Sequence, residues 1–279
     1  TDFLTVERER GISVRTSTAV LEYQGVQMNL IDTPGHVDFS AEVERSLSVL
    51  DAAVLVISAV EGIQAQTEIL YQSLRKAGVE VILFINKIDR VGSRAAEIVE
   101  EIREQFTQAV VVCSKIFGEE TRDCTVQLRS FEEDKFREEV LDTVSILDES
   151  VMERYLEEGE ISTETLKQAL AGCMARGQLC PVLCGSSLMN IGVRELLEFL
   201  VCYGSAVKNR NDDELSGTVY QITHDKTMGR VAHVRLFGGC IQNRDMVSFY
   251  TPGSDEKQQG KVSQIRRYSG SRASDIGKG

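Results

Sequence analysis

Hydrophobic residues in the first ninety positions alternate between strand-like and helix-like spacing. Apolar runs at 20–23 and 26–31 flank a Gln24-Gly25 turn, and this arrangement predicts a β-hairpin. Two later runs, at 52–60 and 79–85, are almost continuously apolar, as buried parallel strands are. The first part of the chain therefore contains a hairpin followed by strands that we expect to be buried on both faces.

Helical spacing separates these predicted strands. Apolar residues recur every three or four positions over 37–50 and again over 64–77. In the second segment we expect Ile69, Leu70 and Leu74 to face inward. The resulting order of strands and helices predicts the α/β class, with a doubly wound parallel sheet.

Residues 90–184 differ in composition, with 11 Lys and Arg against 20 Asp and Glu. We interpret about 93–178 as an inserted α+β subdomain; the alternative is a continuation of the same α/β fold. Apolar patterns predict two short strands and four helices, at 110–113, 125–128, 95–106, 132–144, 151–157 and 163–175. Ser162 is the expected start of the last helix. A strand at 179–184 and a helix at 193–203 then complete a first domain over 1–208.

The hydrophobic period changes to two after a polar linker at 208–214. We expect residues 214–279 to form part of a β-barrel, with Gly238-Gly239 at a turn or bulge and with His224 and His233 as ordinary barrel residues. This part carries 10 Lys and Arg against 6 Asp and Glu, whereas the whole chain has a net charge of −12. The acidic first part therefore argues against a broad basic face for nucleic acid there.

Composition excludes several classes for this chain of 279 residues. The longest apolar stretch, 54–60, is far too short for a membrane helix, and no signal-like segment precedes it. Seven cysteines occur without a CxxC pair, so we expect buried free thiols in a reducing cytosol rather than a zinc site or disulfides. The chain begins with Thr1 and ends in Gly-Lys-Gly, and we expect it to be a piece of a longer protein.

The first candidate for chemistry is the run Asp32, Thr33, Pro34, Gly35 and His36, directly after a predicted strand. A carboxylate at the end of a parallel strand points into the crevice where phosphates bind, and it can hold Mg²⁺ through water. The backbone N–H of Gly35 can approach a terminal phosphate closely because glycine has no side chain. Taken alone, this motif also fits an ordinary strand-end turn.

The second candidate is the run Asn86, Lys87, Ile88 and Asp89, again at a predicted strand end. The Asp89 carboxylate can accept hydrogen bonds from the N1–H and the 2-amino group of guanine, an edge that adenine lacks. Asn86 can tie this loop to other nucleotide-binding segments, and the stem of Lys87 can lie over the base. As a lone tetrapeptide, this run also occurs by coincidence.

A third run, Gly185-Ser186-Ser187, follows the next predicted strand, and the N–H groups of Ser186 and Ser187 could reach guanine O6. Asp32 and Asn86 lie 54 residues apart, with strand and helix alternating between them. The three runs therefore predict one guanine-nucleotide site. Upstream, the charged segment 7–14 contains Ser13, whose hydroxyl could ligate Mg²⁺; the alternative is an exposed charged loop.

In combination, these runs resemble the translational GTPases of the elongation factor G superfamily. Residues 10–13 look like the switch I of that family and residues 32–39, DTPGHVDF, look like its switch II. Residues 86–89, NKID, resemble the guanine-specificity loop, and residues 185–187 resemble the last base-contacting loop. Residues 230–247 look like part of the second domain of that family, a β-barrel. Ser13 stands where the family usually has Thr, which keeps the hydroxyl.

The resemblance implies an enzyme that hydrolyses GTP to GDP and phosphate with Mg²⁺. It implies that Asp32 and Ser13 hold the metal, that Gly35 contacts the γ-phosphate, and that His36 is the catalytic residue that orients the attacking water once the ribosome positions it. The nucleotide-binding residues would be Asp32, Thr33, Pro34, Gly35, His36, Asn86, Lys87, Ile88, Asp89, Ser186 and Ser187. The implied partners are guanine nucleotide and the RNA and proteins of the ribosome, for a cytoplasmic monomer without membrane contact.

Within the superfamily, the 95 residues between Asp89 and Gly185 indicate an inserted subdomain shorter than that of elongation factor G. The segments 46–51, 61–67 and 74–78 look most like the tetracycline-resistance ribosomal protection proteins. We therefore expect a ribosome-dependent GTPase that protects the ribosome from tetracycline. The alternatives are a translocase like elongation factor G and a GTP-binding module without hydrolysis, which the presence of His36 disfavours.

The phosphate-binding motif GxxxxGK[ST], which that family has before switch I, does not occur in these 279 residues. We expect truncation of the sequence rather than loss of the motif, with the first strand and the P-loop missing. Without that first strand, two apolar strands would have an unpaired edge between them. We also expect the isolated chain to be poorly stable, to bind GTP weakly and to be inactive.

Overall fold

The computed structural model describes residue 13 and residues 16–205, 214–225, 229–251, 253–269 and 272–276. Contacts divide the chain into two compact units, one of Thr1–Val49 with Val207–Gly279 and the other of Leu50–Ala206. The second unit ends close to the predicted domain limit at 208, while most of the predicted linker lies outside the described residues. By contacts, residues 1–49 group with the C-terminal strands, and the extent of the first domain over 1–208 stays a prediction.

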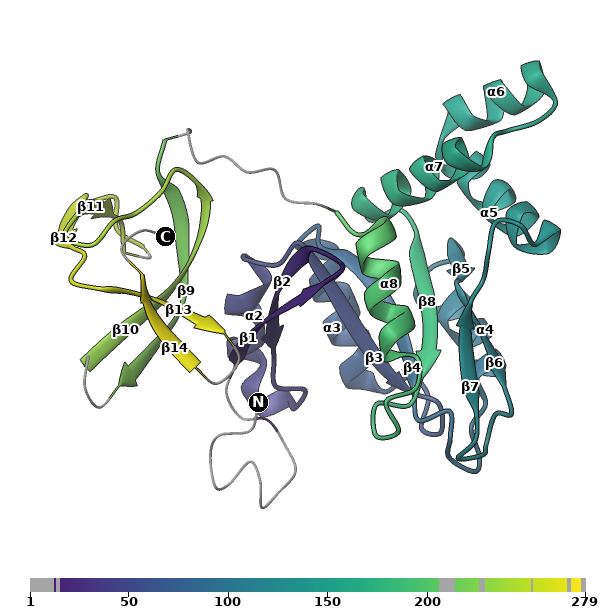
Figure 1. Cartoon of the computed structure of the whole chain (residues 1–279), viewed down its shortest axis with the longest axis horizontal. Helices are drawn as coiled ribbons and strands as arrows, with labels where there is room; N and C mark the ends of the chain where they lie inside the picture. Colours follow the sequence, from purple (N-terminus) through teal and green to yellow (C-terminus); the bar gives the residue numbers. More distant parts are fainter. Residues whose placement is uncertain are drawn as a thin grey trace. The chain divides into compact units, whose positions relative to one another are not determined.

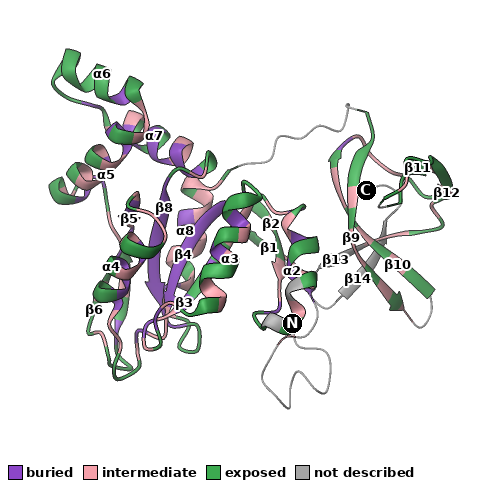
Figure 2. Ribbon diagram, turned by 180° about the vertical axis from the view of Figure 1, so that it is seen from behind, coloured by how far each residue is buried: buried purple, intermediate pink, exposed green. Residues whose placement is uncertain are grey.

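The unit Leu50–Ala206 is built on a parallel sheet of four strands in the order β3 (Ala52–Ser58), β4 (Glu80–Asn86), β8 (Cys180–Gly185) and β5 (Val110–Val112) (Figure 1). Strands β4 and β8 are buried along nearly their whole length, as Figure 2 shows, which explains why their sequences are continuously apolar. The predicted α/β class with a parallel sheet is confirmed.

Helices cover both faces of this sheet. Their bounds are α3 (Ala65–Lys76), α4 (Ala95–Gln105), α5 (Asp134–Leu147), α6 (Glu149–Glu158), α7 (Thr163–Ala175) and α8 (Val193–Tyr203). Ile82, Phe84 and Leu183 of the sheet form one core with side chains of α5, α7 and α8. On the opposite face, the Tyr71 hydroxyl of α3 lies 3.7 Å from the Cys180 sulfur.

The inward face of α3 is only partly as predicted. Leu74 is buried, but Ile69 is 54% exposed, and Tyr71, which the sequence pattern missed, is 2% exposed. Successive helical residues are about 100° apart, so the stripe through Tyr71 and Leu74 turns Ile69 to the outside. Tyr71 also stacks on Phe106 with ring centroids 4.2 Å apart, which fixes this stripe against the end of α4.

The inserted segment is narrower than the predicted 93–178. Strand β5 pairs in parallel with β8, so α4 and β5 continue the α/β fold, which was the alternative interpretation for this stretch. The insertion begins with the antiparallel pair β6 (Ser114–Phe117) and β7 (Thr125–Leu128) and continues through α5, α6 and α7. The predicted start of α7 is confirmed, because the Ser162 side chain accepts a hydrogen bond from the Thr165 N–H at 3.1 Å.

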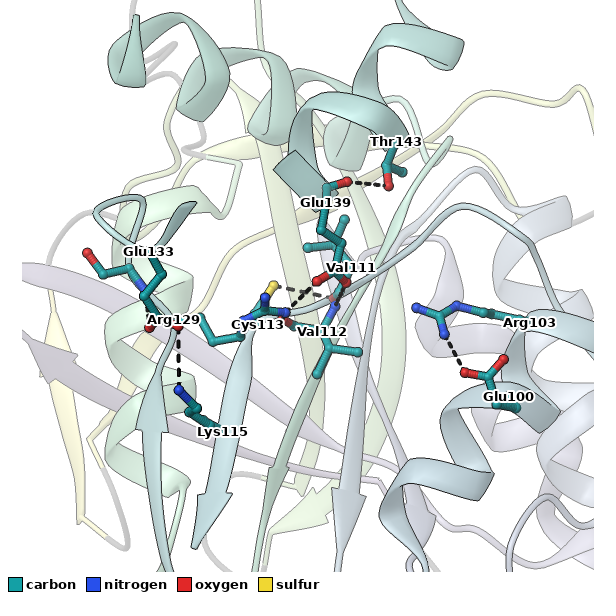
Figure 3. Close-up of polar contacts among 11 residues, drawn as sticks. Glu100, Arg103, Val111, Val112, Cys113, Lys115, Arg129, Glu133, Glu139 and Thr143 are labelled. Atoms are coloured by element: carbon teal, nitrogen blue, oxygen red, sulfur yellow. Dashed lines mark hydrogen bonds and ion pairs between the residues drawn. The ribbon is translucent and has the colours of Figure 1, made fainter. Parts of the chain in front are cut away.

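An ion pair ties the insertion to the sheet (Figure 3). The Arg129 guanidinium donates to Glu139 of α5 and, at 3.0 Å, to the Val112 carbonyl oxygen of β5. Its central carbon lies 4.6 Å from the centre of the Phe136 ring. Because both charges are partnered, the pair holds α5 on the edge of the sheet without leaving a buried charge uncompensated.

The unit Thr1–Val49 with Val207–Gly279 begins, in its described part, with a hairpin of β1 (Ser17–Tyr23) and β2 (Val26–Asp32), as predicted. Gln24 and Gly25 both have positive φ, 48° and 78°, which is the geometry of a tight hairpin turn. A 3₁₀ turn, η1 (Val37–Phe39), then leads into α2 (Ser40–Leu47). The Gln221 side chain donates to the Thr16 carbonyl at 2.8 Å, so hydrogen bonds join this segment to the C-terminal strands.

Within the described residues, those C-terminal strands form three antiparallel pairs, β9 with β10, β11 with β12, and β13 with β14. Their bounds are β9 (Ser216–Asp225), β10 (Gly229–Gly238), β11 (Met246–Phe249), β12 (Gln258–Lys261), β13 (Ile265–Ser269) and β14 (Arg272–Ile276). The register shifts between Leu236 and Gly238, where the sequence predicted a turn or bulge at Gly238-Gly239. His224 and His233 lie on β9 and β10, and burial lowers the pKa of His233. The complete barrel stays a prediction.

The outer edge of the main sheet is open within the described residues. There, β3 pairs with β4 alone and β2 pairs with β1 alone. Val54 and Val56 of β3 are 38% and 53% exposed, although the strand is apolar. The gap that the sequence predicted between two apolar strands stays a prediction.

Five of the seven cysteines are buried, as predicted; they are Cys113, Cys124, Cys173, Cys180 and Cys184. Burial raises the pKa of the Cys184 thiol to about 12, so this group stays protonated and unreactive at neutral pH. Cys202 on α8 is exposed, contrary to the prediction. Among the described residues, no helix has both the length and the apolar character needed to cross a bilayer.

Glu80 is a buried carboxyl at the start of β4 and leads to a prediction about pH. It is 2% exposed; its Oε2 accepts from the Ser205 hydroxyl at 2.8 Å, but its Oε1 has no partner among the described residues. Burial raises its pKa above the ordinary 4.5. The stability that the protonated carboxyl contributes is therefore fully present below about pH 4.5. It is lost as the pH rises through the higher pKa of the carboxyl in the folded state.

Replacing Glu80 with Gln should therefore stabilise the chain at pH 7.5 by about 1 kcal/mol, the cost of a poorly satisfied buried group. The gain should shrink toward zero at pH 4.5. Urea unfolding followed by circular dichroism suits this test, because the chain has no Trp. Glu104→Gln, on an exposed residue of α4, is the control. An equal gain at both pH values would contradict the assignment.

Candidate functional site

Three strands of the sheet end side by side. Ser58 of β3 lies opposite Asn86 of β4, and Asn86 lies opposite Gly185 of β8. Ligands of open α/β sheets bind outside the carboxyl ends of the strands. The runs 86–89 and 185–187, which the sequence singled out separately, are therefore brought together at one end of the sheet.

Asn86 links these two loops through its side chain. Its Oδ1 accepts hydrogen bonds from the Ser187 N–H at 2.9 Å, the Ser187 hydroxyl at 3.1 Å and the Lys87 N–H at 2.9 Å. The Ile88 N–H also donates to the Gly185 carbonyl at 3.2 Å. The structure thus shows the link that the sequence predicted for Asn86.

The loop after β8 is closed on itself. Ser186 and Ile191 exchange two backbone hydrogen bonds of 2.9 Å, and a Cβ on Gly185 would collide with the Ile191 carbonyl and the Phe84 ring. The N–H of Ser186 therefore has a protein acceptor, as does that of Ser187 in the link to Asn86. Their predicted contact with guanine O6 stays a prediction.

Lys87 and Asp89 are held in different environments. Lys87 has a φ of 71°, and its Nζ donates to both carboxylate oxygens of Glu61, at 3.1 and 3.2 Å. This contact lowers the pKa of Glu61. The Asp89 side chain is only 7% exposed, and its Oδ2 lies 4.0 Å from the Arg90 Nε. A nearly buried carboxylate can recognise a polar edge of a ligand with high selectivity.

The run 32–36 belongs to the other compact unit. Asp32 is the last residue of β2 and pairs with Ser17, and Pro34 is buried. His36 is 48% exposed; its Nδ1 accepts from the Asp38 N–H at 3.4 Å and lies 3.6 Å from the Asp38 carboxylate. Its exposed ring is thus available to a water molecule or a partner.

Three further predicted site residues belong to this unit, namely Thr33, Gly35 and Ser13. Thr33 is half-buried and Gly35 is exposed. Ser13 is described, but both residues next to it, and the remainder of the switch I resemblance, lie outside the described residues. The pairing of Ser13 with Asp32 around Mg²⁺ therefore stays a prediction.

Sequence reasoning missed three residues that contact the 86–95 loop, namely Glu61, Glu119 and Glu120. Glu61 follows β3 and reaches Lys87, whereas Glu119 and Glu120 belong to the turn between β6 and β7. The turn residues lie 24–28 positions away from their partners in the chain, so no local spacing could reveal them.

The parallel sheet, with these loops at its carboxyl end, has the form of a nucleotide-binding α/β domain of the GTPase class. The comparison with protein families makes this specific: the chain belongs to the family of the elongation factor Tu GTP binding domain, whose model matches residues 1–206. Guanine nucleotide binding is a property of this family.

The chain is also similar to proteins with a narrower description. It is 36% identical over 267 residues to the tetracycline resistance protein TetP of Clostridium perfringens, and 36% identical over 271 residues to the oxytetracycline resistance protein of Streptomyces rimosus. These matches cover 96% and 95% of the chain but 40% and 41% of the relatives, so the chain spans about two fifths of their length. The predicted resemblance to tetracycline-resistance proteins is confirmed.

A solved structure of a protein from Thermus thermophilus has the same fold. Its TM-score is 0.82 at 25% sequence identity, and the match covers the whole chain and 44% of that protein. The agreement supports the arrangement of strands and helices described above.

Proposed function

We propose that the protein containing this chain is a ribosome-dependent GTPase that protects the ribosome from tetracycline. The observation that carries the proposal is the link from the Asn86 side chain to Ser187, which joins the two loops expected to hold a guanine base. The family of the domain and the tetracycline-resistance relatives support the reaction and the task.

The base site consists of two loops from one sheet. Asp89 accepts hydrogen bonds from the guanine N1–H and 2-amino group, and Lys87 exchanges its contact with Glu61 for one over the base. Ile88 is fully buried and anchors the loop, while Ser186 and Ser187 border the site from β8. Asn86 keeps the two loops in register.

The phosphate side of the site uses residues 32–36. Thr33 and Pro34 shape the turn after β2, and the Gly35 N–H binds the γ-phosphate. The Asp32 carboxylate fits Mg²⁺, because it lies at a strand end and is partly exposed, and carboxylate oxygens are preferred ligands of this ion. Ser13 adds a hydroxyl ligand, and the metal, when bound, neutralises charge on the phosphates.

His36 orients the attacking water, and its half-exposed ring explains why a partner is needed. In the structure its polar contacts are to Asp38, so the ring awaits a surface that directs it toward the nucleotide. The ribosome supplies that surface. The proposal also makes the protein cytoplasmic, because its partner is the ribosome of the cytoplasm, and we propose that it acts there as a monomer.

The test is GTP hydrolysis by the natural protein with and without ribosomes, together with release of ribosome-bound tetracycline. Turnover should rise by about 100-fold or more on ribosomes, in line with the contribution of one positioned catalytic group. Tetracycline should leave the ribosome when GTP is present. Stimulated turnover without drug release would favour the translocase alternative, and binding without any turnover would favour a GTP-binding module.

A further inference from the structure

The turn between β6 and β7 holds the loop that follows Asp89. One carboxylate oxygen of Glu119 accepts from the Ser93 hydroxyl at 2.5 Å and from the Ala95 N–H at 2.9 Å. One carboxylate oxygen of Glu120 accepts from the Gly92 N–H at 2.7 Å. Two consecutive acidic residues of the insertion therefore bind three groups of the segment 92–95.

A fourth hydrogen bond reaches the residue next to Asp89. The Glu120 N–H donates to the Ile88 carbonyl at 2.9 Å, while the Ile88 N–H donates to the Gly185 carbonyl at 3.2 Å. Both backbone polar groups of Ile88 are therefore hydrogen-bonded, and the residue is fully buried. Because Asp89 follows directly, the direction of its carboxylate depends on this arrangement.

The geometry of the turn is specialised for this contact. Glu120 has a φ of 65°, a left-handed backbone conformation that is unfavourable for a residue with a side chain. Gly118 has a φ of 67°, and the Thr121 hydroxyl donates to the Gly118 carbonyl at 2.7 Å, which closes the turn. The strained backbone directs the N–H and the carboxylate of Glu120 to the same loop, where hydrogen bonds offset the strain.

We propose that Glu119 and Glu120 are positioning residues for base selectivity: they hold the segment 88–95 so that Asp89 faces the guanine edge. The inference rests on the proposed function, because it deepens the role of that same site. In this view, part of the insertion has a direct task in nucleotide recognition.

The test measures binding of GTP, ITP and ATP to the natural protein by competition with a fluorescent GDP analogue. ITP lacks the 2-amino group of guanine, which is the group that Asp89 is proposed to bind. The ratio of GTP to ITP affinity therefore reports on this contact of Asp89, because the phosphate contacts are the same for both nucleotides and cancel. Glu119→Ala and Glu120→Ala should each lower this ratio about tenfold, the effect of weakening one hydrogen bond to a charged group. Glu119→Gln and Glu120→Gln keep an acceptor for the Ala95 and Gly92 N–H groups and should restore most of it.

A double-mutant cycle separates positioning from general stability. In an Asp89→Ala background, Glu119→Ala should have no further effect on the ratio, because the group that it positions is gone. Glu132→Ala, on an exposed acidic residue of the same insertion, is the matched control and should leave the ratio unchanged. If the alanine variants do not fold, Ser93→Ala removes one donor to Glu119 and should lower the ratio about threefold.

Equal losses of GTP and ITP affinity would overturn the proposal, as would a loss of ratio that persists without Asp89, or an unchanged ratio in Ser93→Ala. These outcomes leave the proposed function intact as long as the unaltered protein prefers GTP to ITP and ATP. An unaltered protein without this preference would instead contradict the proposed function itself.

Discussion

Replacement of Asp89 by Asn should transfer the base preference of the protein from guanine to xanthine nucleotides. The Asp89 carboxylate offers only acceptors, which match the N1–H and the 2-amino group of guanine. An Asn side chain has one acceptor and one donor, and therefore matches N1–H and the 2-carbonyl of xanthine. Since the side chain is 7% exposed, water cannot compensate for a mismatch.

GTP affinity should fall about 100-fold or more in Asp89→Asn, because a nearly buried polar pair becomes mismatched. XTP should become the better ligand, as competition binding with both nucleotides would show. Asp123→Asn provides a control at an exposed position of the turn between β6 and β7. An Asp89→Asn protein that still prefers GTP over XTP would show that Asp89 does not contact the base.

Replacement of His36 by Ala should abolish ribosome-stimulated hydrolysis while GTP affinity stays unchanged. A side chain that orients or polarises an attacking water contributes about 10²–10⁴-fold to the rate. Removing it should not weaken nucleotide binding, because the ring is 48% exposed and its polar contacts lie with Asp38. Single-turnover hydrolysis on ribosomes, with GTP binding measured separately, tests both statements.

His224→Ala is the matched control, since His224 is an exposed histidine of β9 outside the predicted site. It should retain stimulated turnover. If His36→Ala hydrolysed GTP on ribosomes at the rate of the unaltered protein, the catalytic role assigned to His36 would be wrong. A parallel loss of GTP binding would indicate a structural role for the ring.

The sequence predicted the elements whose signals are local. The hairpin turn at Gln24-Gly25, the helix start at Ser162 and the full extent of α8 depend on neighbouring residues, and all three are present in the structure. The link between Asn86 and Ser187 was also predictable, because the two residues follow parallel strands of one sheet.

Features that depend on distant contacts were not predictable in this way. Strand β5 has three residues, and its place in the main sheet follows from its pairing with β8 rather than from its own pattern. The contacts of Glu119 and Glu120 with the 88–95 loop join separate elements, so only the folded chain reveals them. Strand β12, with the sequence QQGK, lacks the apolar alternation that marks a strand.

The most direct test of the account is growth of a drug-sensitive bacterium across a series of tetracycline concentrations. The natural protein is expressed beside its His36→Ala variant and a strain without either, at matched protein levels. We expect growth at higher drug concentration with the unaltered protein, and no protection with His36→Ala. Absence of protection by an unaltered protein that hydrolyses GTP on ribosomes, or equal protection by both forms, would contradict GTP-driven protection from tetracycline.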